Sequence, residues 1–166
     1  MPERETMRRA EADKRAGKSA STQAGEFVRE EMHHIREGKH GARSTKQAIA
    51  IGLSKARRAG VSLKAPAKGT ASARTRRNAK AALRRGRRKQ KPSARRSRAT
   101  ERVPRREGRS AASHRALARQ AHASARKRGA RARSAAAKKA VATKGARGRS
   151  AAARKAARTR ARRAAR

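Results

Sequence analysis

The sequence contains no Cys, no Trp and no Tyr, and it has a single Phe at position 27. The absence of Cys excludes disulfides, thiolate metal ligands and thiol nucleophiles. The scarcity of aromatic rings argues against modules that stack single-stranded bases on aromatic side chains. No run of about 18 apolar residues is present, and the charged N-terminal segment lacks the apolar core of a signal peptide. We therefore expect a cytoplasmic protein with no membrane association.

Large apolar side chains are also scarce. The chain has 166 residues, of which 42 are Ala and only 15 are Met, Val, Ile, Leu or Phe. Against these stand 52 Lys or Arg and 10 Asp or Glu, which give a formal net charge of +42. Chains of this composition usually bury too little apolar surface to offset the entropy lost on folding. We therefore expect a mostly disordered, all-α protein with one short two-helix hairpin and a basic tail.

Charge and apolar residues are distributed unevenly along the chain. Residues 1–63 carry 14 basic and 8 acidic residues, whereas residues 64–166 carry 38 basic and 2 acidic residues. Only four of the large apolar residues follow Leu63. We accordingly divide the chain into a charged leader at 1–21, a helical hairpin module at 22–63 and a basic disordered tail at 64–166.

The first helix of the module is predicted at about residues 26–37. Val28, Met32 and Ile35 follow the i, i+4, i+7 spacing of one helix face. Gly38 follows this pattern directly and is expected to end the helix, because glycine readily adopts a left-handed conformation.

The second helix is predicted at about residues 45–59. Ser44 and Gln47 match a capping box, in which the Ser side chain caps the helix and the Gln reaches back over it. Gly60 is expected to end the helix, and Val61 can then fold back onto its last turn.

Two helices alone bury few side chains, so the module should be marginally stable by itself. The small residues Ala48 and Gly52 would allow the two helices to approach closely. We expect the module to gain stability from a dimer partner, from a third helix in the leader or the tail, or from nucleic acid.

The tail repeats an Arg-Ser-Ala-Ala pattern three times, and its abundant Ala and Arg are strong helix formers. Like charges four residues apart oppose a helix in solution, and nucleic-acid phosphates would remove that repulsion. We therefore expect the Ala-rich segments to be nascent helices, disordered when free and partly helical when bound to nucleic acid.

The excess of positive charge predicts binding to duplex DNA, or to structured RNA, through the phosphates. Sequence-specific recognition would need side chains held rigidly against base edges, and a disordered tail offers no such scaffold. The expected phosphate contacts are runs of basic residues: Lys46, Lys55, Arg57, Arg58, Arg76, Arg77, Arg84, Arg85, Arg87, Arg88, Lys89, Arg95, Arg96, Arg126, Lys127, Arg128, Arg162 and Arg163.

The hairpin could instead be a helix-turn-helix, with Thr45–Arg58 as the recognition helix. Its loop of seven residues is longer than the usual three or four of that motif. A plain hairpin with a solvated basic face is therefore the favoured interpretation.

Catalytic and metal-binding patterns are weak. Glu30 and Glu31 each precede a histidine, His33 and His34, by three residues, the spacing found in di-iron helical bundles. Such sites need carboxylates from two further helices, and an ion pair between Glu30 and His34 is the simpler interpretation. We expect no catalytic residue, no metal and no cofactor, and therefore no enzyme.

Three segments, Met32–Ile35, Gly38–Gly41 and Lys46–Arg57, resemble a family of small bacterial proteins that share a KQAIAIGLS-x-AR box. That family is of unknown function, and its members are often labelled as DNA-binding. The tail resembles the Ala-, Lys- and Arg-rich tails of linker histones and bacterial histone-like proteins. Together these resemblances imply a histone-like protein of the nucleoid that could dimerise through the module. An RNA- or ribosome-associated protein and an interaction module for an acidic protein remain the alternatives.

Overall fold

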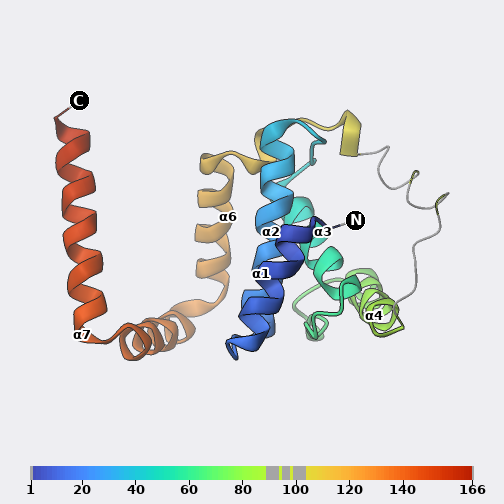
Figure 1. The fold of residues 1–166 in the computed structure, drawn as a ribbon, viewed down its shortest axis with the longest axis horizontal. Helices are drawn as coiled ribbons and strands as arrows, with labels where there is room; N and C mark the ends of the chain where they lie inside the picture. The colour runs from blue at the N-terminus through green and yellow to red at the C-terminus, as the bar shows by residue number, and fades with distance from the viewer. Residues whose placement is uncertain (1, 89–93, 95–97, 99–103, 166) are drawn as a thin grey trace. The chain divides into compact units, whose positions relative to one another are not determined.

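The computed structural model describes residues 2–165 except 89–93, 95–97 and 99–103 (Figure 1). All regular structure in these residues is helical. The elements are α1 (Arg4–Arg15), α2 (Ala20–Glu37), α3 (Thr45–Arg58), α4 (Ala73–Arg87), the 3₁₀ turns η1 (Pro104–Arg106) and η2 (Ser110–Ala112), α6 (His114–Lys127) and α7 (Gly129–Ala164). The chain forms two compact units, Met1–Gln120 and Ala121–Arg166, which are described separately.

The prediction of a mostly disordered chain with one short hairpin is wrong. The leader forms α1, and the predicted tail forms α4, α6 and α7. A count of the large apolar residues alone underestimates the core of this chain. Nine of the thirteen buried apolar side chains in the described residues are Ala. Alanine favours helices, and its small side chain lets helices pack at short range, so the chain needs fewer large residues than we assumed.

Helix α2 begins at Ala20, earlier than the predicted start near residue 26. Ser19 caps it, because its hydroxyl accepts a hydrogen bond from the Thr22 backbone N–H at 3.4 Å. The predicted end is confirmed: Gly38 has a φ of 81°, in the left-handed region. The N–H of Lys39 then donates to a carbonyl of the last helical turn at 3.0 Å.

Helix α3 follows the prediction closely. The Ser44 hydroxyl accepts a hydrogen bond from the Gln47 N–H at 3.2 Å, which confirms the predicted cap. The Gln47 side chain accepts from the N–H of Arg43 at 3.1 Å, one residue earlier than in a standard capping box. At the other end, Gly60 has a φ of 97°, and Val61 is buried against the last turn.

Two apolar clusters stabilise the unit Met1–Gln120. The first consists of the buried residues Met32, Ile35, Ala42, Ala48, Ala111 and Ala112. The second consists of Ala10, Ala24, Phe27, Ala56 and Val61. Phe27 is fully buried, as expected of a core residue. The first cluster joins η2 to the hairpin, and the second joins α1 to it.

Helices α2 and α3 approach closely at Gly52. A Cβ built on Gly52 would lie 2.7 Å from the Val28 Cα and 3.0 Å from the Phe27 carbonyl oxygen. No larger residue fits there without separating the helices. The predicted close approach at a small residue is therefore confirmed.

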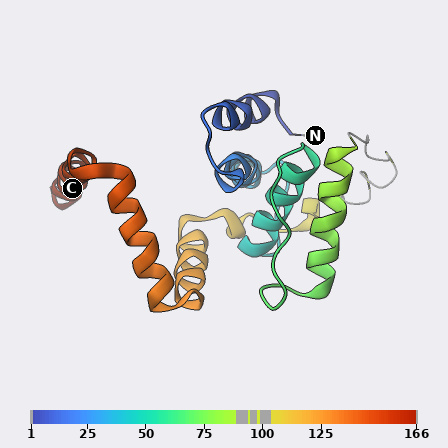
Figure 2. The same cartoon turned by 90° about the horizontal axis from the view of Figure 1, so that it is seen from below.

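Two further helices cover the hairpin (Figures 1 and 2). Helix α1 packs beside α2 and buries Thr6 and Ala10, and α4 packs beside α3 and buries Ala79, Ala82 and Gly86. The additional helices that the module was expected to need therefore come from both the leader and the predicted tail.

The unit Ala121–Arg166 contains the end of α6 and all of α7. None of its described residues is buried. Helix α7 is interrupted at Gly145, whose φ of 62° and ψ of −179° are not helical. No helix in the described part of the chain is long and apolar enough to cross a membrane.

Candidate nucleic-acid interface

Most acidic side chains of the first unit form ion pairs with nearby Lys, Arg or His side chains. Arg9 Nε lies 2.7 Å from Glu26 Oε2, and Lys18 Nζ lies 2.6 Å from Asp13 Oδ1. The hydrogen bond to the carboxylate is the main cause that raises the pKa of Arg9 and of Lys18. In the described residues every ion pair lies between positions 3 and 55. The described cations of α4, α6 and α7 consequently make no ion pair within that part of the chain.

Helix α4 has two unlike faces. Ala79, Ala82 and Gly86 are buried, and these small residues let α4 lie against α3. The opposite side carries exposed cations at i, i+3, i+7 and i+11 spacing, which places them on one stripe. We call Arg77, Lys80, Arg84 and Arg88 the α4 stripe.

Two further arginines, Arg58 and Arg85, are near enough for their charges to interact where α4 packs on α3. Gly86 contacts the backbone of Arg57 and Arg58, and this contact brings Arg85 near Arg58. The surroundings of the Arg58 side chain lower its pKa, first through desolvation and second through the positive charge of Arg85. An anion bound near these two like charges would reduce their mutual repulsion.

Two of the predicted contact residues have structural roles instead. Lys55 Nζ lies 2.7 Å from Glu31 Oε2 and 3.3 Å from Glu30 Oε1, within the hairpin. The Arg57 side chain is buried and donates hydrogen bonds to the carbonyls of Leu63 and Lys64 at 3.1 and 3.2 Å. Burial lowers the pKa of Arg57. Neither side chain is available to a phosphate.

The other predicted residues lie mainly on the surface. Arg76 is half-buried. The exposed ones are Lys46, Arg58, Arg77, Arg84, Arg85, Arg87 and Arg88 in the first unit and Arg126, Lys127, Arg128 and Arg162 in the second. Lys89, Arg95, Arg96 and the Arg163 side chain lie outside the described part of the structure. The structure thus brings the α4 cations together on one helix and leaves the hairpin with two exposed predicted contacts.

The packing of α3 bears on the helix-turn-helix alternative. Helix α3 contacts α2, α4 and η2. Only Lys46, Ala50 and Arg58 of its residues are exposed, and the others are buried or half-buried. A recognition helix must present several side chains to base edges, and α3 presents few.

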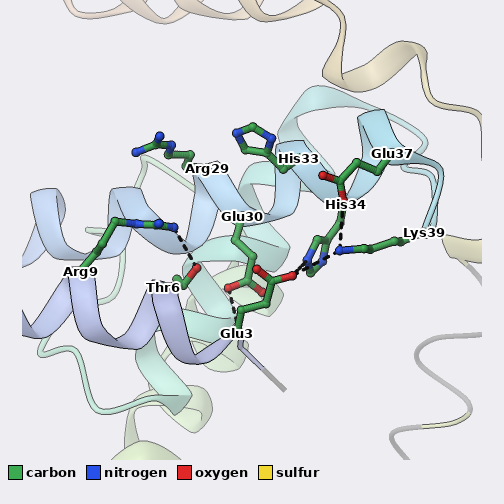
Figure 3. A pocket seen from close by; sticks show the side chains of 9 residues that line it. All are labelled: Glu3, Thr6, Arg9, Arg29, Glu30, His33, His34, Glu37 and Lys39. Carbon is green, nitrogen blue, oxygen red and sulfur yellow. Dashed lines mark hydrogen bonds and ion pairs between the residues drawn. The ribbon is translucent and has the colours of Figure 1, made fainter.

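A second polar site lies where α1 begins beside α2 (Figure 3). It is a pocket of about 300 Å³. Glu3 Oε1 lies 2.7 Å from His34 Nε2 and 3.3 Å from Lys39 Nζ, and the Glu3 N–H donates to Glu30 Oε2 at 3.2 Å. The hydrogen bonds from His34 and then from Lys39 lower the pKa of Glu3. Hydrogen bonds to Glu37 and then to Glu3 raise the pKa of Lys39.

Sequence reasoning paired His34 with Glu30, four residues away on the same helix. The structure pairs His34 with Glu3 and pairs Glu30 with Lys55, so that prediction is wrong. No local sequence pattern predicts the contact between His34 and Glu3, which are 31 residues apart. Recognising that the leader helix packs on α2 would have been needed first.

No curated protein and no solved structure matches the chain. Residues 13–69, which run from the end of α1 through α2 and α3, match a protein family described as a family of unknown function (DUF6496). The match covers 57 of the 166 residues and includes the whole segment for which sequence analysis found a resemblance to a family of unknown function.

Proposed function

We propose that the protein binds duplex DNA through its phosphates without sequence preference, as a histone-like protein of the nucleoid. One observation carries the proposal: the described cations of α4, α6 and α7 have no internal counter-ions, whereas most acidic residues of the first unit are already paired. Helices with so much unpaired positive charge repel themselves, and a polyanion removes that repulsion while releasing its own counterions.

The α4 stripe gives the proposal a defined surface. Its four cations run from Arg77 to the C-cap residue Arg88 and span twelve residues, or about 16 Å at a rise of 1.5 Å per residue. Phosphates on one DNA strand follow each other at roughly 3.4 Å along the duplex axis. The stripe therefore has the reach to follow several successive phosphates. Because α4 is fixed on α3 by small residues, these cations are positioned rather than free.

The proposal of binding without sequence preference depends on the stripe being a single row of cations. Such a row can neutralise successive phosphates, whereas reading a site needs several side chains held against base edges in a groove. The resemblances add support, since related small proteins are often labelled as DNA-binding and basic tails of linker histones act on DNA. Dimerisation through the helical module would let two duplexes be bridged and stays a prediction.

The test compares two triple variants of the full chain that have the same net charge. In the first, Arg77, Lys80 and Arg84 of the α4 stripe are replaced by Gln. In the second, the exposed α1 residues Arg4, Lys14 and Arg15, which make no ion pair in the described residues, are replaced by Gln. Binding to a mixed-sequence DNA duplex is measured by fluorescence anisotropy at several salt concentrations.

We expect the α4 variant to bind more weakly and to lower the log–log salt slope by roughly 3, because each lost phosphate contact contributes about 0.9. The α1 variant should retain nearly the original slope. Equal effects of the two variants would show that charge alone, without the α4 surface, controls binding. Competition with structured RNA and with polyglutamate at matched charge tests the alternatives: a preference for either that persists at high salt would displace duplex DNA as the ligand.

A further inference from the structure

Three potential metal ligands converge at His34, which also lines the Glu3 pocket. Glu31 and His34 lie one turn apart on α2, and His40 comes from the loop that follows this helix. One ligand atom from each residue lies within 4.8 Å of the other two. His40 Nε2 is 3.4 Å from Glu31 Oε1, and the two imidazole rings meet edge to face with centroids 6.0 Å apart. Sequence reasoning sought the missing ligands on further helices, whereas the loop supplies one.

The hydrogen bonding of His40 shows what must lie between it and Glu31. His40 Nδ1 is 3.1 Å from the Gly41 carbonyl oxygen, which can only accept, so Nδ1 carries a proton. In the neutral ring, Nε2 then presents a lone pair to the carboxylate of Glu31. Two acceptors facing each other need a cation between them, either a proton or a metal ion. A backbone carbonyl that orients the remote ring nitrogen is the usual arrangement around metal-bound histidines.

Burial makes the carboxylate a strong ligand for a cation. The Glu31 side chain is 1% exposed, and its Oε2 has no hydrogen bond of good geometry. Lys55 Nζ lies 2.7 Å from that oxygen, but the same ammonium also serves Glu30 at 3.3 Å. Lys55 is the one Lys or Arg of the described residues within ion-pair distance of these two buried carboxylates, and Arg58 acts on Glu31 only from further away. The negative charge of the pair is therefore only partly compensated, which is costly away from water. A divalent ion would compensate it.

We propose that Glu31, His34 and His40 bind a zinc-type divalent cation, with solvent in the remaining position. Two imidazoles and one carboxylate are a ligand set that zinc uses, at bond lengths of about 2.0–2.2 Å. Ligand atoms around a tetrahedral zinc lie roughly 3.3 Å apart, so the widest separation must contract by about 1.5 Å. Binding would therefore move the two half-buried imidazoles toward Glu31.

Such an ion would stabilise the loop between α2 and α3. Gly41 and Ala42 in this loop already bind the segment before α6. Their N–H groups donate hydrogen bonds to the carbonyls of Pro104 and Gly108 at 2.8 and 3.1 Å. Metal bound to His40 would therefore fix the loop to α2 and, through it, residues 104–108. The proposal concerns the hairpin alone and does not depend on the function proposed for the α4 stripe.

The test uses the full chain, freed of nucleic acid and treated with chelator. Zinc chloride is titrated by calorimetry, thermal unfolding is followed with and without zinc, and Co²⁺ is added as a spectroscopic probe of tetrahedral ligation. The variants are His34→Gln and His40→Gln. The matched control is His33→Gln, because His33 is exposed on the same helix and belongs to none of these contacts.

We expect one zinc per chain, a rise in the unfolding temperature and a visible Co²⁺ absorption band. Each ligand variant should lower the affinity by at least about 10–100-fold, the loss already seen when supporting residues are removed, and His33→Gln should behave as the original chain. Each variant is compared with its own metal-free form, so a change in basal stability does not affect the reading. A chain that binds no zinc, or that binds it equally after His34→Gln and His40→Gln, would overturn the proposal and leave a proton between His40 and Glu31.

Discussion

Gly86 of α4 lies so close to the backbone of α3 that a Cβ built on it would overlap the carbonyl oxygen of Arg57. This contact fixes the distance between the two helices and places Arg85 near Arg58. Helix α4, which belongs to the predicted basic tail, thus packs on α3 through a glycine. The same contact positions the charged stripe on the opposite face of the helix.

Replacing Gly86 by Ala should destabilise the protein. In an open helix site this change stabilises by about 0.5–1 kcal/mol, since Ala is the better helix former. At Gly86 the added methyl group must separate α4 from α3, and we expect a net loss of roughly 1–3 kcal/mol. The control is Gly25→Ala in α2, where nothing lies within 4 Å of the added atom. Urea unfolding should give opposite signs for the two variants, and equal stabilisation would show that α4 does not pack closely on α3.

The sequence allowed much of the hairpin to be predicted, because its signals are local. The Ser44 cap, the Gly38 and Gly60 ends and the close approach at Gly52 each depend on residues within a few positions or on one small side chain. The docking of α1 and α4 was not predictable in the same way. It depends on which Ala and Gly residues face a neighbouring helix. Because 42 of the 166 residues are Ala, the sequence pattern does not single out the ones that pack.

The candidate sites also differ in how far the sequence could predict them. A run of basic residues is visible in any sequence, so the surface cations of α4 could be predicted from composition. Which cations are unavailable could not: Arg57 is held by two carbonyls beyond the end of its helix, and Lys55 by carboxylates on α2. The meeting of Glu31, His34 and His40 likewise depends on how the loop returns to α2.

Replacing Lys55 by Met should destabilise the fold with little effect on DNA binding. The change leaves Glu30 and Glu31 buried without their shared cation, and removing one partner of a buried pair costs about 3–5 kcal/mol. We expect roughly 2–4 kcal/mol here, because the Lys55 side chain keeps 18% of its exposure. Lys46→Met, an exposed position on the same helix, should change stability by less than about 0.5 kcal/mol. Urea unfolding measures both. Similar stabilities of the two variants would contradict a structural role of Lys55.

Replacing Arg85 by Gln should have opposite effects on stability and on DNA binding. The loss of a like charge near Arg58 should stabilise the free protein by a few tenths of a kcal/mol, as for other exposed like-charge pairs. Arg85 is also among the residues predicted to contact phosphates, so the same change should lower the salt slope by about 0.9. Thermal unfolding and anisotropy titrations of the same samples check this. The control is Arg74→Gln, an exposed α4 residue whose charge is not among those acting on Arg58. A variant of Arg85 that is less stable than the original would show that the two guanidinium groups do not repel.

The contact between Glu3 and α2 should make stability depend on acid pH. Hydrogen bonds from His34 and Lys39 lower the pKa of Glu3 in the folded protein below its ordinary value of 4.5. A carboxyl group with a lowered folded pKa stabilises the fold fully above its unfolded pKa, and this contribution disappears as the pH falls through the lower, folded value. Urea unfolding of the metal-free chain should therefore show a steeper loss of stability below about pH 4.5 than that of Glu3→Gln, which cannot titrate. Glu11→Gln, an exposed α1 residue for which the described structure gives no ion pair, serves as the control and should keep the original pH profile. If Glu3→Gln and Glu11→Gln follow the same curve, the beginning of α1 is not held to α2 by this carboxylate.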